Sequence, residues 1–436
     1  MYTPKALRKK LRSMVHSLGR HPERFARRPG RDFTRRRALG FETLIFLLLT
    51  MGEKSIGKNL LKHFGNKDDT PYPSAFVQQR QKLLPAALEE LFQRFTAFLQ
   101  PPKLFRGFRL LAVDGTSLKS AAYPGDPLSY RSGTDRQHGW NLRHINALYD
   151  LENGIYTDVF VQKEHEKNEN KALCEMADRS SIDGPVLLLA DRNYESYNTL
   201  AHLENRGWKF IIRLKDKGRA SVSGVKLPKD TEFDLPIHLT LGRLTKRWLE
   251  RQGRSAPEPY YRVPNGVVFD FLEPNSEDFY VLSFRVVRLR DRDGQSITLL
   301  TNLDAESFPP KALRALYARR WGIETSFRSL KYTVGLVHLH AKKPELVLQE
   351  IYACFIVYNF TQAVVWGVDT GQGRSKYQRH VNFSKAVHLC CAFLRKPKGN
   401  LSASLAKELV PHRSGRSYPR PKIAENRISF FYHSAR

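Results

Sequence analysis

The sequence predicts an α/β fold built on one mixed sheet with helical crossovers. Two apolar runs flank Asn153-Gly154, and an Asn-Gly pair between such runs is typical of a β-hairpin. The run 186–190 is continuously apolar, as expected of a central strand that is buried on both faces. A helical segment at 197–205 and a strand at 209–214 follow it, so helices and strands alternate as they do around such a sheet.

The first strands lie before this central one. An apolar strand over 108–113 ends at Asp114-Gly115, and the hairpin strands are expected at 145–151 and 155–161. Three consecutive antiparallel strands are therefore predicted. A polar helix over 166–179 leads from them to the central strand.

The N-terminal part has helical periodicity instead. Residues 1–37 form a strongly basic arm, and helices are expected from Phe41 onward, including one over 76–99 after a proline-containing break. We expect residues 1–100 to be a basic helical DNA-binding region. The alternative for the arm is a solvated basic tail.

After the predicted strand at 209–214 the sequence pattern changes from alternating strands and helices to short strand-like pieces. Residues 216–303 contain short strand-like pieces among charged turns and are expected to form a β-rich insertion. Pro309 and Pro310 then begin a helix that should continue to about Lys331. The expected domains are a sheet domain over 101–370 that contains the insertion, and a basic C-terminal helical region and tail over 371–436.

Charge indicates the class of partner. The chain has 72 Lys and Arg against 43 Asp and Glu, a formal charge of +29 that should attract polyanions. Nucleic acid is the leading candidate, although ribosome-associated and membrane-surface proteins are also basic. The most apolar run, 44–49, is far short of the roughly 20 residues that span a bilayer. The four cysteines show no C-x-x-C spacing. We expect a cytoplasmic, nucleoid-associated protein with no membrane partner.

Three carboxylates stand where phosphodiester chemistry could occur. Asp114 and Asp191 each follow an apolar strand, the position at which open α/β sheets place ligands, although an Asp after a strand is often only a turn residue. Steps of 100° along one helix put Tyr317, Arg320, Glu324 and Lys331 within an arc of about 60°, beside its apolar face.

Such a set suits metal-assisted cleavage of DNA. Two divalent ions held by carboxylates can activate an attacking water or 3′-hydroxyl and stabilise the leaving oxygen. Neighbouring cations neutralise the strand that is cut. Mg²⁺ is the expected ion because it prefers hard oxygen ligands, with Mn²⁺ as the alternative.

These residues resemble a known family. Tyr317, Arg320, Glu324 and Lys331 match every position of Y-x₂-R-x₃-E-x₆-K, the third motif of DDE transposases of insertion sequences. Val113-Asp114-Gly115-Thr116 is similar to the first motif. Asp191-Arg192-Asn193-Tyr194 is similar to the second, with Asn193 in place of the usual Gly.

The resemblance implies a ribonuclease-H-like core and cut-and-paste transposition. It implies that Asp114, Asp191 and Glu324 are the catalytic metal ligands. Candidate contacts to double-stranded DNA, at the transposon ends and the target site, are Tyr317, Arg320, Lys331, Arg192 and Trp321. In some relatives an aromatic side chain stacks on a flipped base, and Trp321 is a candidate for that role, or else a core residue. Two ends must be held together, so a homodimer on DNA is expected.

Two other readings stay open at this point. A metal-dependent nuclease that cuts without strand transfer would use the same carboxylates. A catalytically silent DNA-binding relic or repressor is the other reading, and the intact set Asp114, Asp191 and Glu324 argues against it. The cluster His144, Glu164 and His165 lacks a convincing metal-ligand spacing.

Overall fold

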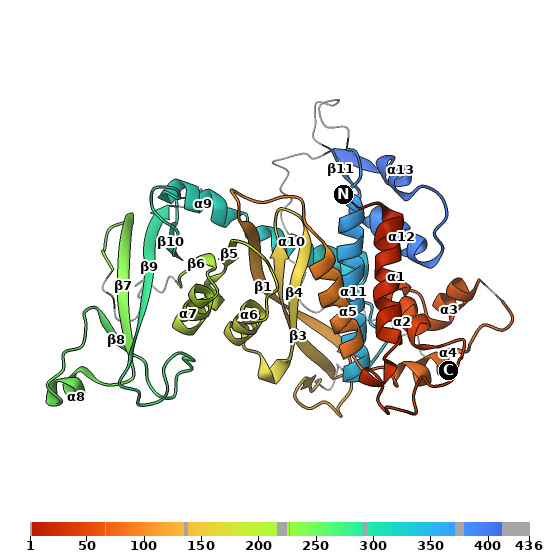
Figure 1. Cartoon of the computed structure of the whole chain (residues 1–436), viewed down its shortest axis with the longest axis horizontal. Helices are drawn as coiled ribbons and strands as arrows, with labels where there is room; N and C mark the ends of the chain where they lie inside the picture. The colour runs from red at the N-terminus through yellow and green to blue at the C-terminus, as the bar shows by residue number, and fades with distance from the viewer. Residues whose placement is uncertain are drawn as a thin grey trace. The chain divides into compact units, whose positions relative to one another are not determined.

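The chain folds into two compact units. The computed structural model describes residues 2–411 except 66, 135–137, 216–224, 226, 291–293 and 371–378, so the predicted basic tail lies largely outside the described residues. One unit, the sheet unit, is Gln100–Arg328, and the other, the helical unit, joins Met1–Leu99 with Ser329–Arg436 (Figure 1). This division differs from the predicted sheet domain over 101–370, because the chain from Ser329 onward packs with the N-terminal helices.

The sheet unit is built on a large mixed sheet. Among the described residues it has ten strands in the order β2-β3-β1-β5-β6-β10-β9-β7-β8, with β4 paired to β3 (Figure 1). The strands are β1 Arg109–Ala121, β2 Tyr130–Arg131, β3 Trp140–Asp150, β4 Ile155–Lys163, β5 Val186–Ala190, β6 Lys209–Arg213, β7 Phe233–Gly242, β8 Tyr260–Arg262, β9 Phe279–Arg290 and β10 Ser296–Thr301.

The predicted hairpin and central strand are confirmed. β3 and β4 pair antiparallel from Asp150↔Ile155 onward, and the Asp150 carboxylate accepts the N–H groups of Glu152 and Asn153 in the turn, at 3.0 and 2.9 Å. β1 pairs antiparallel with β3 and parallel with β5. All five residues of β5 are buried. The strands of the predicted insertion extend this sheet, because β10 pairs antiparallel with β6.

Helices cover both faces of the sheet. α6 (Glu169–Asp178) and α7 (Tyr197–Asn205) contribute buried side chains to one core, together with Leu111 and Val113 of β1. α9 (Pro310–Ala318) packs on the opposite face, with Leu110 of β1. Neighbouring residues of β1 thus enter different cores, which is the alternation expected of a strand buried on both faces. The remaining elements are α8 Lys246–Arg251, α10 Trp321–Arg328 and the short 3₁₀ turns η2 Glu164–Glu166 and η3 Arg192–Tyr194.

The helical unit is centred on α11 (Pro344–Val365), which is buried along most of its length and packs against α5 and α2. The other elements are α1 Pro4–Gly19, η1 Pro22–Arg24, α2 Phe41–Thr50, α3 Ile56–Phe64, α4 Pro73–Arg80, α5 Ala86–Phe98, the π-helix η4 Ser329–Val334, β11 Arg379–Val381, α12 Phe383–Arg395, α13 Leu401–Ala406 and β12 Leu409–Pro411. No helix in the described part of the chain combines the length and apolar character needed to cross a membrane.

One alternative and one expectation for the N-terminal part are wrong. The start of the basic arm is a helix, α1, which buries Leu7, Leu11, Val15 and Leu18, so it is not a solvated tail. The helix predicted over 76–99 is two helices, α4 and α5, because Pro85 lies between them and cannot continue a helix from within. Apolar periodicity persisted across that break and hid it.

A buried ion pair joins α4 to α11 inside the helical unit. The Arg80 guanidinium lies 2.7 Å from Oε1 of Glu350, and their side chains are 2% and 9% exposed. Arg80 also donates from Nε to Oε1 of Gln349, at 2.8 Å. Removing one member of such a pair leaves an uncompensated buried charge.

We expect Glu350→Ala to destabilise the helical unit by about 3–5 kcal/mol, because Arg80 would lose its counter-ion in a site that water cannot reach. Calorimetric unfolding would measure the change. Glu345→Ala is the matched control on the same helix. Its partner Arg27 is 3.5 Å away and both side chains are about half exposed, so the cost should stay within about 0.5 kcal/mol. Equal losses in the two variants would contradict the prediction.

Candidate active site

Two of the predicted carboxylates meet at the same edge of the sheet. β1 and β5 run parallel with Ala112 opposite Leu189, and continuing this register by two residues places Asp114 beside Asp191. Asp191 directly follows β5, as predicted. β1 does not end at Asp114, however, but continues to Ala121 because β3 remains its antiparallel partner there. Asp114 therefore lies where the parallel partner of β1 stops.

The third carboxylate comes from a helix that differs from the prediction. The expected single helix to Lys331 is broken: α9 ends at Ala318, α10 begins at Trp321, and the π-helix η4 follows α10. At the break the N–H groups of Arg319 and Arg320 bond to carbonyls three residues back, which tightens the chain. The uniform steps of 100° behind the predicted arc therefore do not hold across Tyr317–Lys331.

Arg320 links two of the acids. Its guanidinium donates to Oε1 of Glu324 at 2.8 Å and lies 3.7 Å from Oδ2 of Asp114. Its side chain is only 8% exposed. Trp321, the next residue, is 54% exposed, and the Arg320 guanidinium stands over its ring at 5.2 Å. The alternative that Trp321 is a core residue is therefore wrong.

The electrostatic environment of Asp114 is unfavourable for a charge. Burial is the largest effect and raises the pKa of Asp114 to about 7, against the opposing influence of the Gly115 N–H and Arg320. The carboxylates of Asp191 and Glu324 raise it further, so both of these acids lie close enough to act on Asp114. The single positive charge of the Arg320 guanidinium does not neutralise the three carboxylates around it.

The other predicted site residues differ in their burial and in the element that carries them. Tyr317 is buried, and burial raises its pKa, while its hydroxyl interacts electrostatically with Arg320, Arg213 and Asp191. Arg192 follows Asp191 and is exposed. Lys331 belongs to η4 in the helical unit, where burial lowers its pKa.

The acids fit a divalent cation by their chemistry. Within the described ranges, no group of three or more His, Cys, Asp and Glu forms a finished metal cage. Mg²⁺ rarely uses such a cage and instead binds one or two carboxylates together with substrate phosphate. A buried carboxylate with two acidic neighbours and one guanidinium lacks positive charge, which a divalent ion would provide.

Sequence reasoning missed several residues around the site. His144 pairs with Glu169 at 2.9 Å rather than with Glu164 or His165. Arg213 ends β6, and the register Ala190↔Ile212 places it beside Asp191. The position of Arg213 at the end of a predicted strand could have indicated in the sequence that it lies near the site. The His144–Glu169 contact joins residues on a strand and a later helix, and no spacing in the sequence indicates it.

The family model for the transposase DDE domain matches residues 106–360, which is more than half of the chain and includes all three acids. The chain belongs to the DDE transposase family. The transposase is 26% identical over 377 residues to transposase InsG of insertion sequence element IS4 from Escherichia coli strain K12, covering 81% of this chain and 77% of that protein. It is 24% identical over 192 residues to a probable transposase of element IS5377 from Geobacillus stearothermophilus, covering 40% and 41%.

A solved structure is also similar. The piggyBac transposase synaptic complex with hairpin DNA matches at a TM-score of 0.45 and 12% identity, over 96% of this chain and 87% of that chain. The family match shows that this protein is a DNA transposase of insertion-sequence type. Enzymes of this family use divalent metal ions, in agreement with the acids described above.

The burial of the Asp114 charge, together with its acidic neighbours, should lower stability in the absence of metal. Its folded-state pKa is raised, so the unfavourable charge develops as pH rises from about 4 and is complete above 7. At pH 8 in chelator, Asp114→Asn should therefore stabilise the sheet unit by roughly 1 to 4 kcal/mol. Thermal unfolding of the two proteins with and without Mg²⁺ would measure this, with Mg²⁺ raising the wild-type midpoint only.

Asp158→Asn is the matched control. Asp158 is also buried but accepts two bonds from Arg179, both at 2.8 Å, so its charge is compensated. This variant should be less stable than the wild type at the same pH. A destabilised Asp114→Asn protein would show that Asp114 is a structural acid like Asp158.

Proposed function

We propose that the transposase cleaves the ends of its element and joins them to target DNA at the sheet edge that carries Asp114, Asp191 and Glu324. The observation that carries the proposal is the convergence of these acids: Asp114 and Glu324 meet one guanidinium, and Asp191 stands beside Asp114 in register. Acids from a strand, a turn and a helix have no structural reason to be gathered in one partly buried place.

The proposed core is ribonuclease-H-like. Its support is the strand order β4-β3-β1-β5-β6, in which three antiparallel strands are followed by two that run parallel to β1. Asp114 and Asp191 then lie side by side where the parallel pairing of two neighbouring strands stops. Insertion strands β7–β10 extend this core at the β6 side.

Asp114, Asp191 and Glu324 would hold Mg²⁺. When bound, two such ions supply activation of the attacking oxygen and stabilisation of the leaving oxygen. Arg320, released from Glu324 and Asp114, would be free to pair with a phosphate of the cut strand, for which its planar guanidinium is suited. Lys331 and Arg192 are proposed as further phosphate contacts.

Trp321 is proposed to stack on a DNA base. Its ring is exposed next to the acids and is held by the neighbouring Arg320 guanidinium. An aromatic ring in this state can accept a base without first leaving a core. Tyr317 is buried, so we assign it a supporting contact rather than a stacking role.

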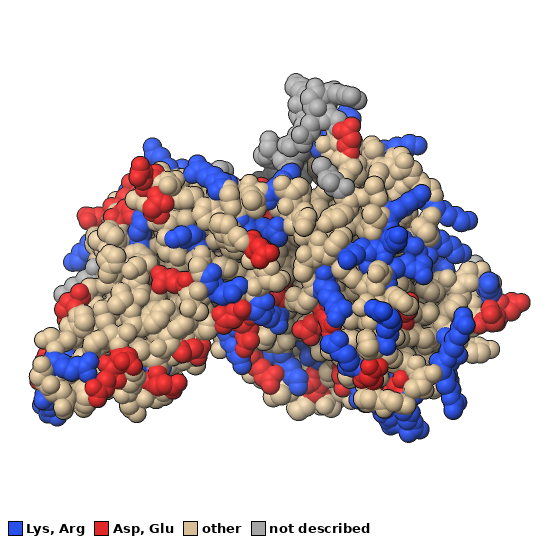
Figure 2. Space-filling model, in the orientation of Figure 1, with Lys and Arg blue, Asp and Glu red and all other residues tan. Residues whose placement is uncertain are grey.

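The helical unit is proposed to bind the transposon end. Figure 2 shows Lys and Arg gathered over this unit where α1 and α12 lie. α1 turns Leu7, Leu11, Val15 and Leu18 inward and leaves Lys5, Lys9 and Arg12 exposed. A helix with one apolar and one basic face can bind phosphates without unfolding. A homodimer on DNA would bring two ends together.

Replacing any one of the three acids by alanine should abolish end cleavage, by roughly 1,000-fold or more, because each is a ligand that activates or stabilises a reacting oxygen. Binding of end DNA should change little, since phosphate contacts elsewhere supply most affinity. Cleavage and joining would be followed on labelled end DNA with a target plasmid.

Asp278→Ala, an exposed acid of the sheet unit, is the control and should cut and join normally. Cut ends without joined products from the wild type would indicate a nuclease. Full cleavage by Asp114→Ala, Asp191→Ala or Glu324→Ala would remove that residue from the site.

Lys5→Gln with Lys9→Gln should weaken DNA binding, and the loss of affinity should be largest at low salt. Each lysine that contacts a phosphate contributes about 0.9 to the slope of log K against log salt, so the slope should flatten by up to about 1.8. Fluorescence anisotropy over a salt series would measure it. Lys5→Arg with Lys9→Arg keeps the charge and should keep the slope, and a double Gln variant with an unchanged slope would exclude α1 from the DNA interface.

A further inference from the structure

Asp114 and Asp191 are each oriented by a backbone N–H group close by in the chain. Oδ1 of Asp114 accepts the N–H of Gly115, and Oδ1 of Asp191 accepts the N–H of Asn193, both at 2.8 Å. The direction of each carboxylate therefore depends on where the next turn of backbone lies. Contacts that hold the backbone of Gly115 and Asn193 in place therefore also set the distance between the two carboxylates.

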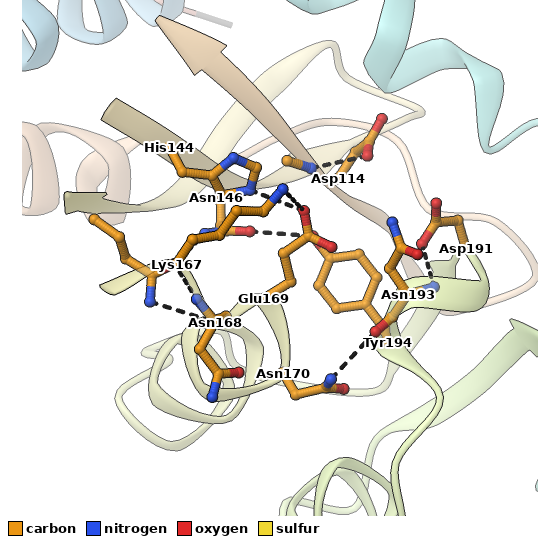
Figure 3. Close-up of polar contacts among 12 residues, drawn as sticks. Asp114, His144, Asn146, Lys167, Asn168, Glu169, Asn170, Asp191, Asn193 and Tyr194 are labelled. Carbon is orange, nitrogen blue, oxygen red and sulfur yellow. Dashed lines mark hydrogen bonds and ion pairs between the residues drawn. The ribbon is translucent and has the colours of Figure 1, made fainter. Parts of the chain in front are cut away.

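The start of α6 contacts both of these residues, and Figure 3 shows the Asn170 side chain directed at Asn193. Glu169 lies against Gly115: a Cβ atom on Gly115 would stand 2.9 Å from its Oε1 and 2.3 Å from Nε2 of His144. Only glycine leaves room for these two side chains. Asn170, the next residue of α6, donates from Nδ2 to the carbonyl of Asn193 at 3.2 Å.

The start of α6 is held in turn by hydrogen bonds to β4 and, through Gln162, to β3, two strands that carry neither Asp114 nor Asp191. The side chain of Gln162 on β4 accepts the N–H of Asn168 at 3.2 Å and donates to its carbonyl at 3.1 Å. Asn146 on β3 donates to the same Gln162 oxygen at 3.0 Å and accepts the hydroxyl of Tyr194 at 3.3 Å. These hydrogen bonds thus also reach the turn that follows Asp191.

The carboxylate of Glu169 has two nitrogen groups of its own close by, from His144 and Lys167. Its Oε1 lies 2.9 Å from Nε2 of His144, although the two groups are not well aligned as a hydrogen bond, and 3.2 Å from Nζ of Lys167. The contact with His144 is the main cause that lowers the pKa of Glu169. Its carboxylate is therefore already compensated, whereas that of Asp114 is not.

We propose that Glu169 and Asn170 are positioning residues that set the spacing of Asp114 and Asp191 and thereby determine how tightly the transposase binds divalent ions. The inference rests on the proposed function, since it takes both aspartates as ligands. Groups behind the ligands of a metal site commonly change affinity by 10- to 100-fold when they are removed. Glu169 and Asn170 act through backbone rather than through a ligand side chain.

The test compares Glu169→Gln, which keeps the shape but loses the ion pairs, with Glu175→Gln, an exposed glutamate on the same helix. Mn²⁺ binding to the metal-free protein would be measured by calorimetry, and the Mg²⁺ concentration for half-maximal end cleavage in parallel. We expect both values to rise at least about 10-fold for Glu169→Gln and to stay unchanged for Glu175→Gln. Cleavage at saturating Mg²⁺ should return to within a few-fold of wild type.

Asn170→Ala is the second variant, and it should weaken Mn²⁺ binding in the same direction through the other aspartate. If either soluble variant loses cleavage or thermal stability while its metal dependence stays that of the wild type, the residue is merely structural and the proposal fails. Asp114→Ala separates this outcome from failure of the proposed function. Wild-type Mn²⁺ affinity in Asp114→Ala would mean that the metal site itself is elsewhere.

Discussion

The parallel pairing of β1 with β5 is the constraint on which this site depends. Parallel neighbours require a long connection, and here the β3–β4 hairpin and α6 make it. Once the two strands pair, Asp114 and Asp191 must lie at the same edge of the sheet. The connection also returns the start of α6 to that edge, so the elements that make the pairing possible are the ones that touch the turns after both acids.

Placing these acids close together destabilises the folded protein electrostatically, because the surrounding residues do not neutralise the charge of Asp114. Another buried acid of the sheet unit, Asp126, is neutralised locally: it is 4% exposed but bonds to Ser129 and Arg143, and these contacts outweigh burial and lower its pKa. Around Asp114, burial and its acidic neighbours outweigh Arg320. Sites that are kept unfavourable in this way are commonly functional, because the missing charge is supplied by a ligand.

The break between α9 and α10 determines where the Arg320 side chain lies. In one continuous helix Arg320 and Trp321 would point about 100° apart, and nothing would tighten the chain between them. The turn at Arg319 and Arg320 buries the guanidinium against Glu324 while the Trp321 ring stays exposed. Gly322 allows α10 to approach the sheet, because a Cβ atom there would stand 2.6 Å from the Leu151 side chain.

The sequence by itself determined the hairpin of β3 and β4 and the central strand β5, because local patterns encode them. The Asn153-Gly154 turn and the apolar run of β5 depend only on neighbouring residues, and so do the positions of Asp114 and Asp191 beside them. The motif around Glu324 identified the third acid through its resemblance to a family. The long helix was mispredicted because apolar periodicity continued through a turn set by packing on the sheet.

Only the tertiary structure decided which residues surround the acids. His144 and Glu169 lie on a strand and a later helix, and they meet because β3 carries His144 across Gly115 while α6 begins above it. The same holds for Arg80 and Glu350, which come from helices at opposite ends of the chain. Side-chain contacts of this kind depend on distances between elements, and a one-dimensional pattern contains no such distances.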